Sequence, residues 1–268
     1  KKMVFQGGGG NCLNSNAALK VCTFLVTLAA ACSLALAEIA YPTVINDAAF
    51  WLDASDASTI TLDENGNVTE WRSKVGSDSA CQYSGYTAPR YDTTSYGIPT
   101  VDFGDVGSKQ DLKFSNLINV KTVFWVTRIV KNGNAFLLGS TGNCHFHRGE
   151  DGQYGHSVDS KFNRVWNRSV EVNPFVDAPD PNRFEIICAE MQDGCKANTL
   201  SNDRNYTSTS KNRNGGRQLS ELICFNRELT EEERIAVTDY LKSKWHYKIN
   251  VTLNADENIL FKIDTSLF

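Results

Sequence analysis

The sequence predicts an all-β protein, a two-sheet antiparallel β-sandwich that carries one C-terminal amphipathic helix. Three observations favour this fold class. From Glu38 onward, short apolar runs alternate with turns rich in Gly, Asn and Asp, as strands and their connections do. Leu219–Phe225 is apolar at both alternating sets of positions apart from Ser220 and Glu221, as expected of a strand covered on both faces. Thr230–Trp245 has the caps and the spacing of a helix.

Residues 1–37 have the pattern of an export signal. Lysines precede an apolar run at Val21–Ala31, and Ala35-Leu36-Ala37 fits the small-x-small rule, so cleavage is expected after Ala37. A transmembrane anchor and a lipoprotein modified at Cys32 are the alternatives, although the apolar run is shorter than the roughly 20 residues that a bilayer requires. The mature protein is therefore expected to be secreted or held at the cell surface, without membrane insertion of the mature domain.

The first strands follow this segment. Ala49–Leu52 is a short apolar strand, and Thr59–Leu62 and Val68–Trp71 flank an Asn65-Gly66 turn, which predicts a hairpin. The alternating oxygen side chains of Asp63, Asn65 and Asn67 could belong to a calcium loop. No Glu follows at the spacing that an EF-hand requires, so a plain turn is favoured.

The middle of the chain is expected to hold the central strands. Residues 72–95 are polar and contain several tyrosines, which indicates a long loop or a set of edge strands. Thr122–Thr127 reads as a central strand, and Ala135–Gly139, after the Asn132-Gly133 turn, is predicted to be its hairpin partner. Two further strands are predicted at Arg164–Asn167 and Phe184–Ala189.

The helix can be predicted residue by residue. Thr230 and Glu233 have the spacing of a capping box, in which each side chain binds the backbone N–H of the other residue. An apolar stripe then predicts the buried face, with the head of Lys244 reaching water. Its members are Val237, Tyr240, Leu241, Lys244 and Trp245. Two strand-like runs beyond the helix, within residues 249–268, indicate the start of a further β segment of a longer exported protein.

Charge and cysteine content restrict the function classes. A net charge of −4 and a pI near 5.6, without a long basic run, argue against nucleic acid as a partner. Five cysteines follow residue 37, and Cys188 and Cys195 flank a predicted hairpin turn at 191–194. A disulfide between these two and a pair of buried free thiols remain open. No CxxC spacing occurs, which disfavours a cysteine metal site.

The most chemically suggestive segment is Gly139–Asp151. His145 and His147 alternate, which would place both imidazoles on one face of a strand, and Glu150 or Asp151 with His156 could complete a metal site. A structural or surface role is favoured over a metal, so no cofactor is expected, with calcium left open. The candidate ligand-binding residues are His145, His147, Arg148, Asp151, Trp166, Asp203 and Arg204.

Three blocks of sequence resemble a known family. The block Gly-Gly-Arg-x-Leu-x-Glu-Leu-Ile-x-Phe-Asn-Arg-x-Leu-Thr-x-x-Glu-Arg, starting at Gly215, is similar to the C-terminal signature of laminin-G-like domains of the concanavalin A-like superfamily. Phe50–Asp56 and Tyr96–Phe103 resemble the opening strand and the next strand pair of that family. The resemblance implies a jelly-roll domain over residues 38–248, and because one sandwich hosts many activities it fixes no function.

Three functions fit such a domain. The favoured expectation is a non-catalytic extracellular module that binds carbohydrate or another cell-surface ligand, within a polypeptide that carries further domains. A spacer without a ligand is the first alternative. A glycoside hydrolase or lyase of the same fold is the second, but the Glu-x-Asp-x-x-Glu run typical of such hydrolases is absent. Exposed aromatic side chains clustered on one rim would favour the sugar-binding hypothesis, and their burial would favour the spacer; the candidates are Tyr83, Tyr86, Tyr91, Tyr154 and Trp166.

Overall fold

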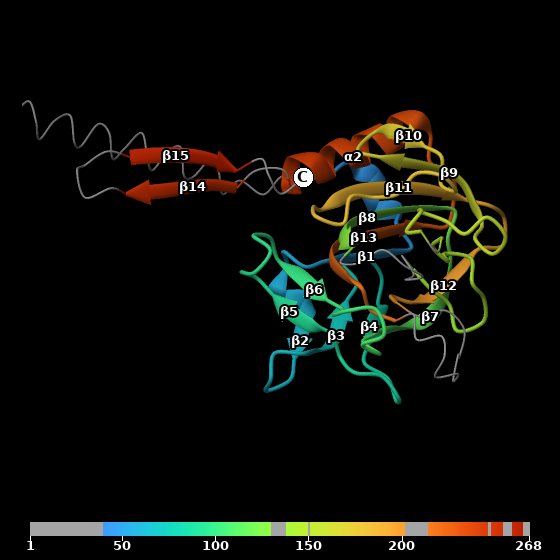
Figure 1. The fold of residues 1–268 in the computed structure, drawn as a ribbon, viewed down its shortest axis with the longest axis horizontal. Coiled ribbons are helices and arrows are strands. Elements are labelled where there is room, and N and C mark those ends of the chain that lie inside the picture. The colour runs from blue at the N-terminus through green and yellow to red at the C-terminus, as the bar shows by residue number, and fades with distance from the viewer. Residues whose placement is uncertain are drawn as a thin grey trace, which may run out of the picture. The chain divides into compact units, whose positions relative to one another are not determined.

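The computed structural model describes residues 40–129, 138–149, 151–201 and 214–245, with the backbone of 248–253 and 259–264. The predicted export signal, Glu150, Asp203 and Arg204 lie outside these residues. Two antiparallel sheets form a sandwich, and helix α2 (Glu231–Trp245) covers the outer face of the larger one (Figure 1). The predicted all-β sandwich with a C-terminal helix is confirmed. None of the described helices is long and apolar enough to cross a bilayer.

The larger sheet has eight strands. Seven follow one another in the order β10 (Val170–Val172), β9 (Phe162–Asn167), β11 (Glu185–Met191), β8 (Thr122–Ile129), β13 (Arg217–Phe225), β6 (Thr100–Asp102) and β5 (Arg90–Asp92). The eighth, β1 (Phe50–Asp53), pairs with β13.

The smaller sheet has five strands, in the order β12 (Lys196–Thr199), β7 (Lys113–Asn119), β4 (Ser79–Cys81), β3 (Val68–Arg72) and β2 (Ile60–Leu62). Two short 3-10 helices flank β1, namely η1 (Thr43–Asp47) and η2 (Ala57–Thr59). The β2–β3 hairpin turns at Asp63, whose carboxylate accepts the backbone N–H groups of Asn65 and Asn67. The hairpin predicted over these residues is confirmed.

Strand β13 is the centre of the larger sheet. All nine of its residues are buried, as predicted for a strand covered on both faces. One edge pairs with β8, and the other pairs first with β6 at Leu219 and then with β1 from Glu221 onward. The pairing with β8 has a bulge at Ser220, whose carbonyl accepts the N–H of Ala54, just past the end of β1.

Two apolar cores lie on the two faces of the larger sheet. The period of two along each strand sends alternate residues to opposite faces. One core lies between the sheets and includes Phe50, Leu52, Trp71, Phe114, Val123, Trp125 and Leu222. The other lies under α2 and includes Trp51, Phe124, Val126, Trp166, Ile223, Val237, Leu241 and Trp245.

The start of α2 has the predicted capping box. The backbone N–H of Thr230 donates to Oε2 of Glu233 at 2.9 Å, and the backbone N–H of Glu233 donates to Oγ1 of Thr230 at 3.3 Å. The helix runs from Glu231 to Trp245, as the stripe and caps predict. Four of the five stripe residues pack in the core under α2: Val237, Tyr240, Leu241 and Trp245.

Two predicted hairpins are wrong. Strand β8 pairs with β11 on one edge and with β13 on the other, so it has no hairpin partner. Residues 130–137 of the predicted hairpin lie outside the described part of the chain, and Gly139, which is described, pairs with Thr199. The turn between Cys188 and Cys195 joins β11 of the larger sheet to β12 of the smaller sheet, so it is a crossing between sheets. Cys188 lies in the core under α2 and Cys195 in the core between the sheets, and both are free thiols.

The last two strands pair with each other. β14 (Lys248–Leu253) and β15 (Ile259–Asp264) form an antiparallel two-stranded sheet. Both strand-like runs expected beyond the helix are therefore strands.

Candidate functional site

The segment with the most histidines is a pair of linked loops. We name residues 138–149 and 151–160 the histidine loop. It contains no strand in its described part, so the expected strand carrying His145 and His147 is wrong. Backbone hydrogen bonds hold it instead: the N–H of His147 donates to Cys144 O, the N–H of His156 to His147 O, and the N–H of Lys161 to His145 O. These bonds place His147 beside His156.

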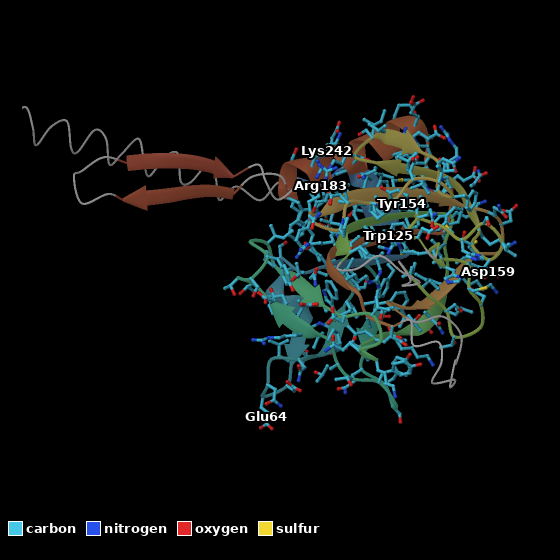
Figure 2. All side chains as sticks on the ribbon, viewed as in Figure 1. Glu64, Trp125, Tyr154, Asp159, Arg183 and Lys242 are labelled. Carbon is cyan, nitrogen blue, oxygen red and sulfur yellow. The ribbon has the colours of Figure 1, made fainter. Side chains whose placement is uncertain are left out.

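Three side chains of this loop meet at one point. Oδ2 of Asp159 lies 3.2 Å from Nδ1 of His147 and 3.4 Å from Nδ1 of His156. The imidazoles stack, with centroids 4.9 Å apart and planes 18° from parallel. His147 is buried, whereas the side chains of His156 and Asp159 are 28% and 38% exposed, so the cluster opens to solvent on one side. Figure 2 shows Asp159 at the periphery of the sandwich, with Trp125 inside it.

Within the described residues, this trio is the group of His, Cys, Asp and Glu side chains whose ligand atoms all lie within 4.8 Å of one another. The sequence pattern pointed to His147 and His156 but not to Asp159. The missed signal is the His-x-x-Asp spacing, which closes one turn here: the N–H and the hydroxyl of Ser160 both donate to the carbonyl of His156.

The other predicted residues of this loop lie apart from the trio. His145 is half-buried, and burial together with the charge of Lys161 lowers its pKa. Asp151 is exposed on a turn. Arg148 is 1% exposed and donates to the carbonyl of Gly152, and its Nε and Nη1 have no hydrogen-bond partner. This side chain therefore belongs to the interior of the loop, and its burial lowers its pKa to about 10.

Trp166 lies under the helix. It is 3% exposed in the core beneath α2, and two guanidinium groups lie over its ring, with Arg164 at 4.5 Å and Arg234 at 4.2 Å from the centroid. Because the side chain is buried, no face of the ring is open for a sugar to stack on. Tyr154 is buried as well, and its hydroxyl accepts a hydrogen bond from Asn167.

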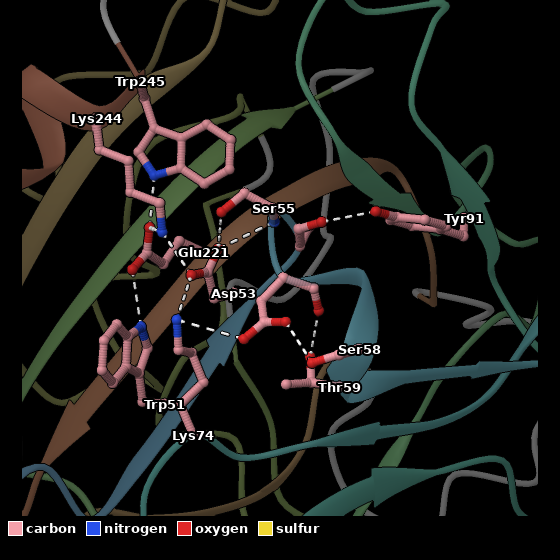
Figure 3. Close-up of polar contacts among 12 residues, drawn as sticks. Trp51, Asp53, Ser55, Ser58, Thr59, Lys74, Tyr91, Glu221, Lys244 and Trp245 are labelled. Carbon is pink, nitrogen blue, oxygen red and sulfur yellow. Dashed lines mark hydrogen bonds and ion pairs between the residues drawn. The ribbon is translucent and has the colours of Figure 1, made fainter. Parts of the chain in front are cut away.

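A second polar centre is buried between β1, β13 and α2. We name Trp51, Asp53, Lys74, Glu221, Lys244 and Trp245 the Glu221 cluster (Figure 3). The indole N–H of Trp51 donates to Oε1 of Glu221, and the indole N–H of Trp245 to Oε2. Glu221 is thus a buried carboxylate with both oxygens hydrogen-bonded.

Two lysines neutralise the two carboxylates of this cluster. Nζ of Lys244 lies 2.6 Å from Asp53 and 2.8 Å from Glu221, and Nζ of Lys74 lies 3.0 Å from Asp53. The expectation that Lys244 extends to water is therefore wrong, because its side chain is 14% exposed and points inward to an ion pair. Burial raises the pKa of Glu221, whereas Lys244, Ser55 and Lys74 overcome the effect of burial on Asp53 and lower its pKa.

A pair of tyrosines lies on the connection from β4 to β5. The rings of Tyr83 and Tyr86 are 4.4 Å apart at their centroids and tilted by 32°, and both are partly exposed. The hydroxyl of Tyr83 donates to Oδ2 of Asp111 at 2.8 Å, which fixes its orientation. Nζ of Lys113 lies 5.8 Å from the centre of the Tyr83 ring. Tyr91 differs, because its hydroxyl donates to the carbonyl of Ala54 and its ring packs on the core.

Comparison of the chain with protein-family models, with curated proteins and with solved structures finds no match.

Proposed function

We propose that the protein is an exported, non-catalytic recognition module that binds carbohydrate at the cell surface through Tyr83 and Tyr86. The observation that carries this proposal is the tilted, partly exposed ring pair on the β4–β5 connection. Aromatic rings at binding sites offer large, rigid apolar area with a polar tip, which suits the C–H face and the hydroxyls of a sugar.

The surroundings of the pair also favour recognition. Asp111 is completely buried and holds the Tyr83 hydroxyl, so the ring is ordered before a ligand arrives. Lys113 adds a cation beside the ring, which favours a sugar that carries a carboxylate or sulfate. We therefore expect an acidic polysaccharide to be the preferred ligand class.

The hydrolase alternative is weaker. A glycosidase needs two carboxyl groups across a cleft that admits the sugar and water. Asp53 and Glu221 are adjacent, but their side chains are 2% and 1% exposed and both bind Lys244. Two carboxylates that are shielded from water and neutralised by lysine stabilise the fold and cannot attack a substrate. Their burial supports the non-catalytic proposal.

The laminin-G-like resemblance of the three sequence blocks agrees with the proposal, because such sandwiches serve as extracellular recognition modules. A spacer without a ligand remains the competing hypothesis. Tyr154 and Trp166 are buried, as aromatic side chains would also be in a spacer without a ligand. The partly exposed Tyr83 and Tyr86 favour recognition over the spacer.

The test is a binding screen of the purified chain against neutral and acidic polysaccharides, read by melting temperature and then by calorimetry. A ligand that binds the folded state raises the melting temperature by mass action. We expect one class of acidic polysaccharide to raise the melting temperature. Tyr86→Ala should weaken binding by at least about tenfold, which corresponds to about 1.4 kcal/mol.

Two variants serve as controls. Tyr86→Phe keeps the ring and should retain most of the affinity if stacking dominates. Phe175→Ala removes an aromatic side chain that is 39% exposed on another loop, and it should leave binding unchanged. If no polysaccharide raises the melting temperature of the wild-type chain, the proposal is wrong and the spacer hypothesis is favoured.

A further inference from the structure

We propose that His147, His156 and Asp159 form a binding site for a transition-metal ion of the Zn²⁺ class, with two imidazole Nδ1 atoms and one carboxylate oxygen as ligands. This inference is independent of the sugar-binding proposal, because it rests on different residues of a different loop.

The spacing between the carboxylate oxygen and each imidazole nitrogen fits such an ion. Ligands at about 2.0–2.1 Å from a tetrahedral zinc ion are separated from each other by roughly 3.3 Å. The Asp159 oxygen lies 3.2 Å from Nδ1 of His147 and 3.4 Å from Nδ1 of His156. The ligand atoms of all three residues lie within 4.8 Å of one another. The two rings are stacked with planes 18° from parallel, so binding one ion requires the more exposed His156 ring to rotate until its Nδ1 lone pair meets the ion held by His147 and Asp159.

The hydrogen bonding of His156 points the same way. Its Nδ1 atom is buried and has no hydrogen-bond partner, although the carboxylate of Asp159 is close. A buried ring nitrogen without a partner is costly, and a metal ion would satisfy its lone pair. Nδ1 of His147 hydrogen-bonds to the same Asp159 oxygen in the metal-free chain, and a cation would replace this hydrogen bond and engage His156 as well.

The loop holds these ligands in place without the metal. The N–H of His156 donates to the carbonyl of His147, which sets the two histidines side by side, and Ser160 closes the turn that carries Asp159. Fixed ligands reduce the entropy that binding would otherwise cost. The partly exposed side of the cluster leaves the remaining coordination positions open to water or to an incoming ligand.

The ligand types select the metal. Imidazole nitrogen suits Zn²⁺, Ni²⁺, Cu²⁺ and Co²⁺, whereas Ca²⁺ and Mg²⁺ take oxygen ligands, of which the trio supplies one residue. The site should therefore bind Zn²⁺ and not Ca²⁺, the reverse of the calcium possibility that the sequence left open.

The test is calorimetric titration of the EDTA-treated and dialysed full chain with Zn²⁺, and in parallel with Ca²⁺ and Mg²⁺. We expect one Zn²⁺ to bind per chain. Ca²⁺ and Mg²⁺ should give no binding heat at the concentrations at which Zn²⁺ saturates the site. His156→Ala and Asp159→Ala should each lower the affinity for Zn²⁺ at least tenfold. His145→Ala and Asp151→Ala, in the same loop but outside the trio, are matched controls and should bind as the wild type does.

Cysteine is the main competing ligand, because Cys144 lies three residues before His147 and thiolate binds zinc well. Cys144→Ser should leave Zn²⁺ binding unchanged. The visible spectrum of the Co²⁺ complex of the unmutated chain adds a readout that needs no variant, and we expect nitrogen and oxygen ligation without a thiolate charge-transfer band. Loss of binding in Cys144→Ser, a thiolate band, unchanged affinity in both Ala variants of the trio, or no Zn²⁺ binding would each overturn the proposal.

Discussion

Asp53 and Glu221 lie opposite each other in the pairing of β1 with β13, and both carboxylates bind the single ammonium group of Lys244. Two adjacent acids on a central strand pair repel each other unless a cation lies between them. Lys244 arrives from the last turn of α2, so the ion pair also attaches the helix to the sheet. Trp245 adds an indole hydrogen bond to the same Glu221.

Replacing Lys244 by Met should therefore destabilise the fold strongly. The substitution keeps most of the apolar stem but leaves two buried carboxylates with Lys74 as their remaining cation. Removing one partner of a buried ion pair costs about 3–5 kcal/mol. Chemical unfolding in guanidinium chloride, followed by tryptophan fluorescence, measures the difference.

Lys242→Met is the matched control on the same helix. Lys242 pairs with Asp239 and Ser169 on the surface, where ion pairs contribute about 0–1 kcal/mol. Figure 2 shows Lys242 on the outer side of α2. Equal losses of stability in the two variants would mean that Lys244 contributes no more than a surface lysine.

The capping box gives a second prediction. Thr230→Ala removes the oxygen that accepts the N–H of Glu233 and should cost about 1 kcal/mol of stability.

Hydrogen bonds from Arg227 and from the backbone of Thr230 lower the pKa of Glu233 to about 2, below its ordinary 4.5. A lowered carboxyl pKa stabilises the fold above pH 4.5, and this contribution is lost as the pH falls towards 2.

Glu233→Gln isolates this pH dependence. The wild-type chain should be more stable than the variant at neutral pH, and the difference should shrink as the pH falls from about 4.5 towards 2. Urea unfolding at a series of pH values measures both. A difference that is constant over this range would contradict the assigned role of the Arg227–Glu233 pair.

The thiols supply a third prediction. Cys188, Cys195 and Cys224 are buried free thiols, and burial raises the pKa of each, that of Cys195 to about 11. Because the thiolate is the reactive form, these three should resist a thiol reagent in the native chain and react after unfolding. The partly exposed Cys81 and Cys144 should react before these three. Mass spectrometry of labelled peptides identifies each site, and a Cys188–Cys195 disulfide in the native chain would refute the arrangement.

Local patterns explain what the sequence could predict. The capping box of Thr230 and Glu233 and the stripe through Val237 and Leu241 depend on neighbours within a few residues, so periodicity and caps were sufficient. The place of Lys244 was not predictable in this way. Its partner Asp53 lies on the first strand, far away in the sequence. The Lys244 side chain points inward because the pairing of β1 with β13 places the Asp53 carboxylate within its reach.

The histidine loop shows the same limit. Alternation of His145 and His147 predicted a strand, but hydrogen bonds between separate parts of the loop produced turns and brought His156 and Asp159 to His147. A period of two has meaning only where a neighbouring strand continues the ladder. The tyrosine pair was predictable as an aromatic-rich loop, whereas the hydrogen bond that orients Tyr83 depends on Asp111, 28 residues away.

Asp111 gives the last prediction, which concerns the pH dependence of stability. Burial raises its pKa from 3.8 to about 7, while hydrogen bonds from Tyr83 and from the backbone of Ser201 and the charge of Arg217 limit the rise. A raised carboxyl pKa means that the folded chain keeps a proton that the unfolded chain releases. Its contribution to stability is therefore complete below about pH 3.8 and is lost as the pH rises through about 7.

Asp111→Asn imitates the protonated form at every pH. The stability of the wild-type chain relative to this variant should fall as the pH rises from about 4 to about 7 and change little beyond that. Asp151→Asn, which removes an exposed carboxylate, controls for the change in net charge. If the wild-type chain instead gains stability over the variant as the pH rises, the donors around Asp111 outweigh its burial. Asp111 would then hold Tyr83 as a buried carboxylate anion throughout the neutral range.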